Sequence, residues 1–226
     1  MKKRPIIAID GPAASGKSTT ARHLAKLLGF VYLDTGAMYR ACALQAERTG
    51  TNLSDPEDVS EMLEKLDIRI ELESEANIIL LDGEDVSQAI RANTISKLAS
   101  DISALPPVRH KMVELQRKIG YKGGVILDGR DIGTYVFPDA EIKFFLTASA
   151  EERAKRRWLE LYAKGIKKPP AEVLAELQTR DKNDASRELA PLAKAEDAIE
   201  IDTTGMSIDQ QVAKLHQIIR ERMDHR

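Results

Sequence analysis

Ile6-Ile7-Ala8-Ile9-Asp10-Gly11-Pro12-Ala13-Ala14-Ser15-Gly16-Lys17-Ser18-Thr19 is the stretch that decides the fold of this chain. An apolar strand runs into the pattern GxxxxGK[ST], and the residues that follow have helical periodicity. The glycines let backbone N–H groups approach a phosphate closely, and the new helix points its positive dipole end at the same place. Lys17 can reach the β- and γ-phosphates, and the Ser18 hydroxyl can ligate Mg²⁺. Residues 11–19 therefore predict a nucleoside triphosphate site.

The composition fits one α/β domain without a strong overall charge. The chain has 226 residues, with 34 basic and 36 acidic side chains and a formal net charge of −2, so we expect neither a nucleic-acid partner nor an acidic membrane surface. Its single cysteine, Cys42, lies between two alanines, which predicts a small buried helical residue and not a nucleophile. No apolar run approaches the ~18 residues of a membrane span. We expect a cytoplasmic monomer.

Short apolar runs suited to buried parallel strands alternate with helical patterns. The runs cover residues 6–9, 31–33, 125–127, 142–146 and 198–201. Helices are predicted over 17–28, ending at Gly29, over 149–164 behind the capping box at Ser149, and from Ser207 onward. This alternation predicts a parallel sheet with helices on both faces.

One region interrupts the alternation. Residues 67–73 alternate strictly between apolar and polar side chains, and Asp82-Gly83 is a turn signal. Two or three antiparallel strands of this kind cannot belong to the parallel sheet. We therefore expect residues 58–90 to form a small inserted lobe, flanked by helices near 56–66 and 93–105. A flexible joint is expected at Lys167-Lys168-Pro169-Pro170.

A polar segment follows the apolar run 125–127. Asp128 comes first, where a carboxylate can hold Mg²⁺ or its water opposite Ser18. The next residues, Gly129-Arg130-Asp131-Ile132-Gly133, lie at the carboxyl end of the strand, where open α/β sheets bind ligands. Arg130 and Asp131 could form a simple surface ion pair, but the flanking glycines favour contact with a ligand. The chain lacks an Asn-Lys-x-Asp motif, which argues against a GTPase switch.

Further candidates follow the second strand and recur along two helical patterns. Thr35 suits a helix N-cap and a ligand contact equally, and Arg40 suits a clamp on a second phosphate. Arginines recur at helical spacing in two sets, which are Arg153, Arg156 and Arg157, and Arg180 and Arg187 with Asp184 between them. Such runs form either a solvated charged face or the cations that phosphoryl transfer needs, and spacing alone leaves both interpretations open.

Five segments together resemble the cytidylate kinase family of bacterial nucleoside monophosphate kinases. They are GPAASGKST (11–19), LDTGAMYR (33–40), DGRDIGTYVFPDA (128–140), ERAKRR (152–157) and RDKNDASR (180–187). The resemblance covers nearly the whole chain, and DGRDIGT with the inserted lobe is its most specific part. It implies a P-loop kinase fold, with a five-stranded parallel sheet flanked by helices and a small antiparallel β insertion. It also implies phosphorylation of CMP and dCMP by ATP with Mg²⁺.

The resemblance implies a role for each candidate residue. Residues 11–19 would hold ATP, with Lys17, Arg130, Arg153 and Arg157 catalytic and Ser18 and Asp128 at the metal. The CMP phosphate would be bound by Arg40 and Arg130, with Arg180 nearby. The base would be recognised by Thr35, Arg109, Asp131 and Arg187. The pentose would be contacted by Ser100 and Asp184. Arg153 and Arg157 would belong to a mobile lid within 150–190.

The chemistry of cytosine agrees with the base assignment. Cytosine offers an N–H₂ donor beside two acceptors, which a carboxylate and guanidinium groups complement, whereas uracil would set an acceptor against Asp131. Thr35 stands where many members of the family have serine.

Two other hypotheses keep the phosphate loop. One is another small P-loop kinase, acting on shikimate or dephospho-coenzyme A, which would not be expected to carry DGRDIGT with the inserted strands. The other is a non-catalytic NTP-binding switch, in which the distant arginines would have no acceptor to hold.

Overall fold

A five-stranded parallel sheet forms the centre of the computed structural model, which describes residues 4–71 and 77–224. Its strands are β1 (Ile6–Asp10), β2 (Val31–Asp34), β6 (Val125–Gly129), β7 (Ile142–Thr147) and β8 (Ile199–Asp202). They lie in the order β2-β6-β1-β7-β8, and every neighbouring pair is parallel. The predicted α/β class is confirmed, and each strand overlaps the apolar run that predicted it.

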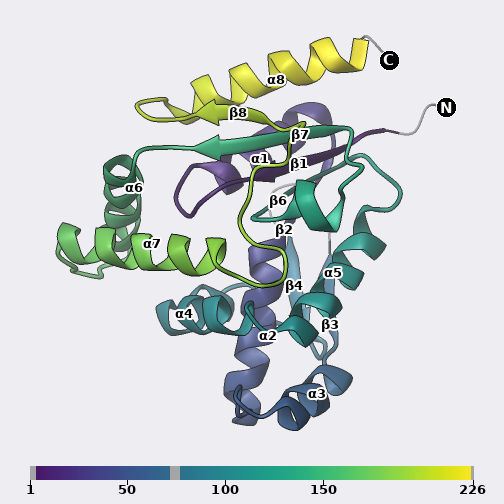
Figure 1. Ribbon diagram of the computed structural model, residues 1–226, viewed down its shortest axis with the longest axis vertical. Coiled ribbons are helices and arrows are strands. Elements are labelled where there is room, and N and C mark those ends of the chain that lie inside the picture. Colours follow the sequence, from purple (N-terminus) through teal and green to yellow (C-terminus); the bar gives the residue numbers. More distant parts are fainter. Residues whose placement is uncertain (1–3, 72–76, 225–226) are drawn as a thin grey trace.

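Helices cover both faces of this sheet because alternate side chains of each strand point to opposite sides. Ile7 and Ile9 of β1 pack in one core with residues of α1 (Lys17–Leu28) and α8 (Ile208–Asp224). Ile6 and Ala8 pack in the other core with residues of α2 (Thr35–Thr49) and α5 (Pro106–Gly120). In Figure 1, α8 runs along the top of the molecule, whereas α2 to α5 gather in its lower half.

The predicted helix ends are confirmed where local signals set them. Gly29 ends α1 in the left-handed conformation, with φ of +62°. The Ser149 hydroxyl accepts the N–H of Glu152 at 3.2 Å and starts α6 (Ala150–Ala163). Before α8, Ser207 and Gln210 exchange the reciprocal bonds of a capping box. Each of these ends depends on residues at most four positions apart.

The antiparallel insertion is also confirmed. Its strands β3 (Ile68–Glu71), β4 (Ile78–Leu81) and β5 (Glu84–Asp85) form a separate sheet, and residues 72–73 of the predicted strand lie outside the described residues. Asp82 and Gly83 make the predicted turn, with φ of +50° and +82°. Ile68 and Leu81 are buried in the core that also holds α2. The small sheet is therefore fixed to the main body by apolar packing.

Helices flank the small sheet on both sides, as predicted. The first is α3 (Pro56–Lys65), and α4 (Asn93–Ile102) follows a short 3₁₀ turn, η1 (Ala89–Arg91). The second helix ends at Ile102, earlier than the predicted 105. Pro106 begins α5 and disfavours helical backbone at Leu105, which is extended, so the helix cannot include residue 105.

Helices α6 and α7 (Pro170–Ala185) form an arm that projects at the left of Figure 1. They pack through a small core of their own, in which Ala154, Val173 and Leu177 meet Ala13 of the loop after β1. Residues 164–169 join the two helices, and the flexible joint predicted at 167–170 overlaps this connection and the first residue of α7. Among residues 4–71 and 77–224, no helix combines the length and the apolar character that a membrane span requires.

Candidate active site

The loop between β1 and α1 requires glycine at both of its ends. Gly11 has a φ of +142°, and a Cβ there would lie 2.1 Å from the carbonyl oxygen of Leu146. Gly16 has a φ of +94°, and its Cβ would lie 2.6 Å from Oε1 of Gln211. These contacts bring the loop close against β7 and α8. A side chain at Gly11 would meet the backbone of Leu146, whereas one at Gly16 would strain the positive-φ backbone and displace the Gln211 side chain.

Lys17 is held inside this loop. Its Nζ donates to the carbonyl oxygen of Pro12 at 2.6 Å, and only 4% of the residue is exposed. Burial lowers the pKa of Lys17 to about 7, and the positive charge of Arg130 acts in the same direction. A phosphate placed on this amine would supply the counter-charge that it lacks.

We therefore expect ADP binding at pH 8 to take up about one proton, because the amine is mostly neutral in the free protein and charged beside a phosphate. Calorimetry at pH 8 in two buffers with different ionisation enthalpies measures this uptake. The variant Lys17→Met corrects for protons bound by ADP itself and should lose the uptake. At pH 6, Lys17 is already charged and should contribute none. A wild-type uptake no larger than that of Lys17→Met at pH 8 contradicts this expectation.

Asp128 lies opposite the start of α1. The Ser18 hydroxyl donates to Oδ2 of Asp128 at 2.6 Å, and the Tyr32 hydroxyl donates to Oδ1 at 2.7 Å. Burial raises the pKa of Asp128, and the neighbouring charge of Asp34 adds to the effect. Ser18 and Asp128 thus lie together, as the sequence predicted.

These oxygen donors fit a magnesium ion. Magnesium prefers oxygen ligands and usually keeps several waters, with one or two carboxylates and the substrate phosphates. In the described part of the chain, no group of three or more His, Cys, Asp or Glu side chains is arranged to hold a metal by itself. The protein therefore offers the partial set that a nucleotide-bound magnesium needs.

Tyr32 was not predicted as part of the site. In the sheet, Asp34 pairs with Asp128 and Tyr32 pairs with Ile126, so Tyr32, Asp34 and Asp128 share one face. The contact joins residues that are 96 positions apart, and it depends on the pairing of β2 with β6. No local pattern in the sequence signals that pairing.

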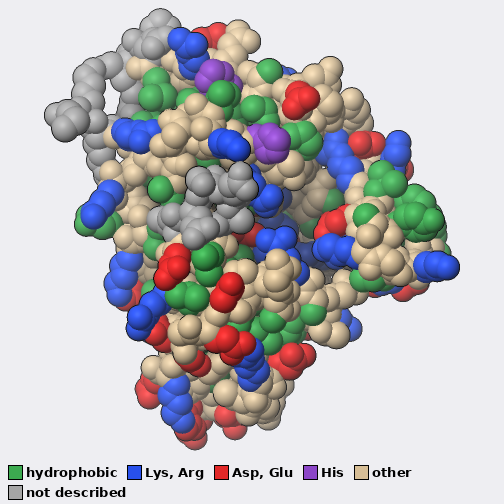
Figure 2. Space-filling model, turned by 180° about the vertical axis from the view of Figure 1, so that it is seen from behind, with side chains coloured by type: hydrophobic (Ala, Val, Ile, Leu, Met, Phe, Trp, Pro, Cys, Tyr) green, Lys and Arg blue, Asp and Glu red, His purple; other side chains and the backbone are tan. Residues whose placement is uncertain are grey.

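A cleft of about 420 Å³ opens between the phosphate loop, α2, α4 and the arm. Figure 2 shows Lys and Arg side chains gathered in this hollow, beside the arm at the right of the view. The predicted residues that line it are Ala13, Ala14, Gly16, Lys17, Ser18, Thr19, Thr35, Arg40, Arg109, Asp128, Arg130, Asp131, Arg157, Arg180, Asp184 and Arg187. Residues from both halves of the sequence therefore meet in one place.

Carboxylates hold the arginines deep in the cleft. Asp184 accepts the Nε–H of Arg130 at 2.8 Å and also pairs with Arg187. Burial acts to raise the pKa of Asp184, but Arg130 and Arg187 bring it below its usual value. Arg109 pairs with Asp131, although burial still raises the pKa of Asp131. These pairs fix the guanidinium groups in position before any ligand arrives.

Arg180 carries the charge in this cluster that is least compensated. Its Nε is buried and has no hydrogen-bond partner among the described residues. Burial lowers the pKa of Arg180 to about 10, and the repulsion from Arg130 contributes. Arg40 pairs with Asp34 at 2.9 Å, and its own Nε is also buried without a described partner. An anion in the cleft would satisfy both side chains.

Some predicted residues lie elsewhere. Gly11, Pro12 and Ser15 belong to the phosphate loop but do not line the cleft, and neither does Ser100 on α4. Arg153 donates to the carbonyl oxygens of Ala148 and Ala13 and pairs with Asp181, so it ties the arm to the phosphate loop. Its place as a catalytic residue stays a prediction.

Two further sets of arginines have the same helical spacing in the sequence but lie in different places in the structure. Arg156 binds Glu152 and Thr203 outside the cleft, whereas Arg157, one residue later, lines it. The helix α7 ends at Ala185, so the prediction that Arg187 continues its face is wrong, although Arg187 still contacts Asp184 from beyond the helix end.

Thr35 is not the N-cap of α2. Asp34 takes that position, and its carboxylate accepts the N–H of Ala37 at 2.9 Å. The Thr35 hydroxyl donates instead to the carbonyl oxygen of Asp128 at 2.6 Å and lines the cleft. Cys42 is buried within the same helix, and burial raises the pKa of its thiol to about 12, which confirms it as an unreactive core residue.

Several lining residues were not predicted. They include Arg22, Tyr39, Arg91, Ser96, Ser103 and Lys164. Ser103 accepts from Arg187 at 2.8 Å, and the Tyr39 ring lies with its centroid 5.7 Å from the guanidinium carbon of Arg109. Ser103 follows the end of α4, and Tyr39 lies among the small residues of α2. Their spacing in the sequence therefore does not predict that either residue lines the cleft.

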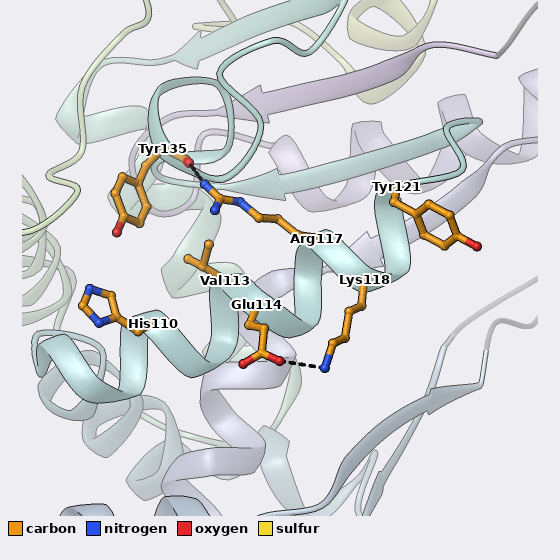
Figure 3. A pocket seen from close by; sticks show the side chains of 7 residues that line it. All are labelled: His110, Val113, Glu114, Arg117, Lys118, Tyr121 and Tyr135. Atoms are coloured by element: carbon orange, nitrogen blue, oxygen red, sulfur yellow. Dashed lines mark hydrogen bonds and ion pairs between the residues drawn. The ribbon is translucent and has the colours of Figure 1, made fainter.

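A second hollow, of about 690 Å³, lies on the outer face of α5. Figure 3 shows that Lys118 pairs there with Glu114, while Arg117 donates to the carbonyl oxygen of Tyr135. Its two main cations are therefore already engaged, and glycine-rich backbone is absent from its lining. Only the smaller cleft combines a phosphate loop with uncompensated positive charge among the described residues.

Comparison with known proteins agrees with this geometry. The family model described as cytidylate kinase matches residues 7–221. The chain belongs to the cytidylate kinase family. A protein named cytidylate kinase from Carboxydothermus hydrogenoformans is 54% identical over 218 residues, covering 96% of this chain and 98% of the relative. Another of that name, from Geobacter sp. (strain M21), is 50% identical over 218 residues, covering 96% and 94%.

A solved structure of an uncharacterized protein from Eubacterium ventriosum shares the fold. It matches with a TM-score of 0.52 at 13% identity, covering 99% of this chain and all of the other. At this level of identity the match describes the architecture and not the activity.

Proposed function

We propose that this member of the cytidylate kinase family transfers the γ-phosphoryl group of ATP directly to a phosphate oxygen of CMP or dCMP, giving CDP or dCDP. One observation carries the proposal. The phosphate loop with Lys17 lies in the same cleft as Arg40, Arg130 and Arg180, so two anionic groups can be held facing each other. An NTP-binding switch would need only the first half of this arrangement.

The reaction needs charge stabilisation more than proton transfer. A phosphate oxygen of CMP is already anionic, so no general base is required. Residues 11–19 cradle the ATP phosphates, and Lys17 binds the oxygens on which charge increases in the transition state. Bound Mg²⁺, held by Ser18 and Asp128 directly or through water, would neutralise part of the phosphate charge. Arg40 and Arg130 orient the acceptor.

Closure of the arm excludes water, which would otherwise attack ATP. Arg157 already lines the cleft from α6 and can bring a positive charge to the γ-phosphate. Arg153 is held against the phosphate loop through Ala13, so it can transmit loop binding to the arm within 150–190. The segment 167–170, which runs from the connection into the first residue of α7, is the place where this motion is expected.

Base recognition follows from the pair formed by Arg109 and Asp131. The Asp131 carboxylate accepts from the N–H₂ of cytosine, and guanidinium groups of Arg109 and Arg187 donate to the ring acceptors. Thr35 closes the same side of the cleft. Ser100 and Asp184 contact the pentose in this proposal. Asp184 also fixes Arg130 and Arg187, so it connects sugar binding with phosphate binding.

Replacing Asp131 with alanine is expected to narrow the preference for CMP over UMP. Uracil presents an acceptor where cytosine presents a donor, and a buried mismatch of this kind costs ~1–3 kcal/mol, or roughly 5- to 150-fold in kcat/KM. The ratio of kcat/KM for CMP and UMP measures the effect. An unaltered ratio in an active Asp131→Ala variant rejects the role of Asp131.

Release of ADP from ATP and Mg²⁺ with a panel of acceptors tests the proposed function. Strong dependence on CMP and dCMP supports it. Dependence on shikimate or dephospho-coenzyme A instead supports another small P-loop kinase. ATP binding without any acceptor-dependent turnover supports a non-catalytic switch. The panel therefore separates the three hypotheses in one assay.

A further inference from the structure

Asp10 is a buried carboxylate at the junction of the two halves of the site. It ends β1 immediately before Gly11, and only 4% of the residue is exposed. Its Oδ1 accepts the N–H of Ile132 at 2.8 Å, and its Oδ2 accepts the N–H of Gly133 at 2.7 Å. Burial raises the pKa of Asp10 to about 7, and these two N–H groups oppose the rise. The two bonds therefore offset part of the cost of burying the group.

The two N–H groups belong to the first residues of η2 (Ile132–Val136), a short π-helical turn. The first N–H groups of any helical turn have no partner inside it and need one from elsewhere. An aspartate just before the turn normally supplies that partner by folding its own carboxylate back. Here the residue in that position is Asp131.

Asp131 does not cap the turn. Its side chain makes no capping bond and instead pairs with Arg109 and lines the cleft. Asp10 supplies the cap from β1, 122 positions earlier in the chain. A Cβ on Gly133 would lie 3.4 Å from Oδ2 of Asp10 and 3.1 Å from Cδ of Lys143, so glycine permits this close approach.

We infer that Asp10 is a positioning residue for acceptor recognition, because capping η2 from β1 leaves the Asp131 carboxylate to pair with Arg109 and to line the cleft, where in the proposed function it faces the substrate base. The same residue precedes Gly11, so it also fixes the acceptor loop relative to the phosphate loop. This inference rests on the proposed function, in which Asp131 reads the base. It assigns Asp10 an effect on the choice of acceptor, although Asp10 does not line the cleft.

The variants Asp10→Asn and Asp10→Ser test the inference. Asparagine retains one acceptor for a backbone N–H and loses the other, whereas the shorter serine side chain has a single oxygen one bond closer to the backbone. In either variant at least one N–H group at the start of η2 loses its partner, and the Asp131 carboxylate can bond to the turn in its place. We expect the ratio of kcat/KM for CMP and UMP to fall by about five- to tenfold, the factor that corresponds to one lost cap. The affinity for ADP should change by less than this ratio, because the residues of the phosphate loop are unchanged and Asp10 is only one of several charges that act on Lys17.

Glu141→Gln provides a matched control. Glu141 accepts the N–H of Ile6 at 2.8 Å, so it is also a carboxylate bound to backbone N–H, but at the opposite end of β1. The variant Glu141→Gln should leave the ratio of kcat/KM for CMP and UMP unchanged. A fall in the ratio as large as that of Asp10→Asn would attribute the effect to general loosening of β1 and overturn the inference.

The double variant Asp10→Asn with Asp131→Ala separates positioning from plain loss of stability. If Asp10 acts through Asp131, the double variant should discriminate between CMP and UMP as Asp131→Ala does alone. Independent, multiplying losses overturn the inference. An unchanged ratio in Asp10→Asn, with an active wild type, overturns it and leaves the proposed function standing. A wild type that does not use CMP refutes the proposed function itself.

A crystal structure of the wild type with CMP keeps the inference testable if the Asp10 variants do not fold. Asp10 should remain bonded to the N–H groups of Ile132 and Gly133 while Asp131 faces the base. An Asp131 carboxylate found capping η2 in that complex overturns the inference.

Discussion

Replacing Lys17 with alanine is expected to lower kcat by ~10³-fold, roughly 4 kcal/mol of transition-state stabilisation, while the KM for CMP stays within about threefold. Lys17 is the cation that the phosphate loop itself encloses, bonded to the carbonyl of Pro12 and buried against solvent. Its contribution grows as charge develops on the oxygens around the transferred phosphorus. In the proposed function CMP binds through arginines on the other side of the cleft, so we expect its binding to change little.

Single-turnover measurements with saturating ATP and Mg²⁺ separate this effect from product release. Lys26→Ala is the matched control, because Lys26 belongs to the same helix but does not line the cleft. It should turn over at the wild-type rate. Near-normal turnover in Lys17→Ala would refute the assignment of the phosphate loop.

Local signals in the sequence were enough to predict the helices and strands and the phosphate loop. Gly29 and the capping residues Ser149 and Ser207 act within one helical turn, so their effect can be read without knowing the rest of the fold. The requirement for glycine at 11 and 16 follows from the same kind of reasoning, although the atoms that enforce it belong to β7 and α8. The parallel strands follow from short continuous apolar runs, and the antiparallel insertion follows from side-chain alternation.

Contacts between distant segments set the rest of the site. Arg153 and Arg157 are one helical turn apart, and both suit a phosphate, yet only Arg157 lines the cleft. Asp181 on α7 and the carbonyl of Ala13 bind Arg153 because the arm packs against the phosphate loop. The sequence contains these partners but not the angle at which the arm meets the sheet.

The strand order explains the other omissions. Because β6 lies between β2 and β1, the residues at the end of β6 and just after it meet side chains from both neighbouring strands. Tyr32 reaches Asp128 from one side, and Asp10 reaches Ile132 from the other. Tyr32 is part of an apolar run, and Asp10 ends the strand before the phosphate loop. The local sequence therefore accounts for each residue without assigning it a role in the site. Only the order of the strands gives them a second role.

Replacing Arg130 with alanine is expected to lower kcat/KM for CMP by ~10²–10³-fold, about 3–4 kcal/mol, with little change in the affinity for ATP. The change removes a guanidinium that we propose orients the acceptor phosphate. It also leaves the buried Asp184 with Arg187 as its remaining paired cation, so the acceptor side of the cleft loses its arrangement as well as a charge.

Arg130→Lys distinguishes charge from geometry. Lysine keeps the positive charge but not the planar fork that engages Asp184 and a phosphate at once, so we expect only part of the activity to return. Arg69→Ala, an exposed arginine on the small sheet, is the control and should behave as the wild type. Acceptor kinetics in Arg130→Ala that match the wild type would remove Arg130 from the phosphate clamp. Full activity in Arg130→Lys, with loss in Arg130→Ala, would show instead that the site needs a cation here and not the fork.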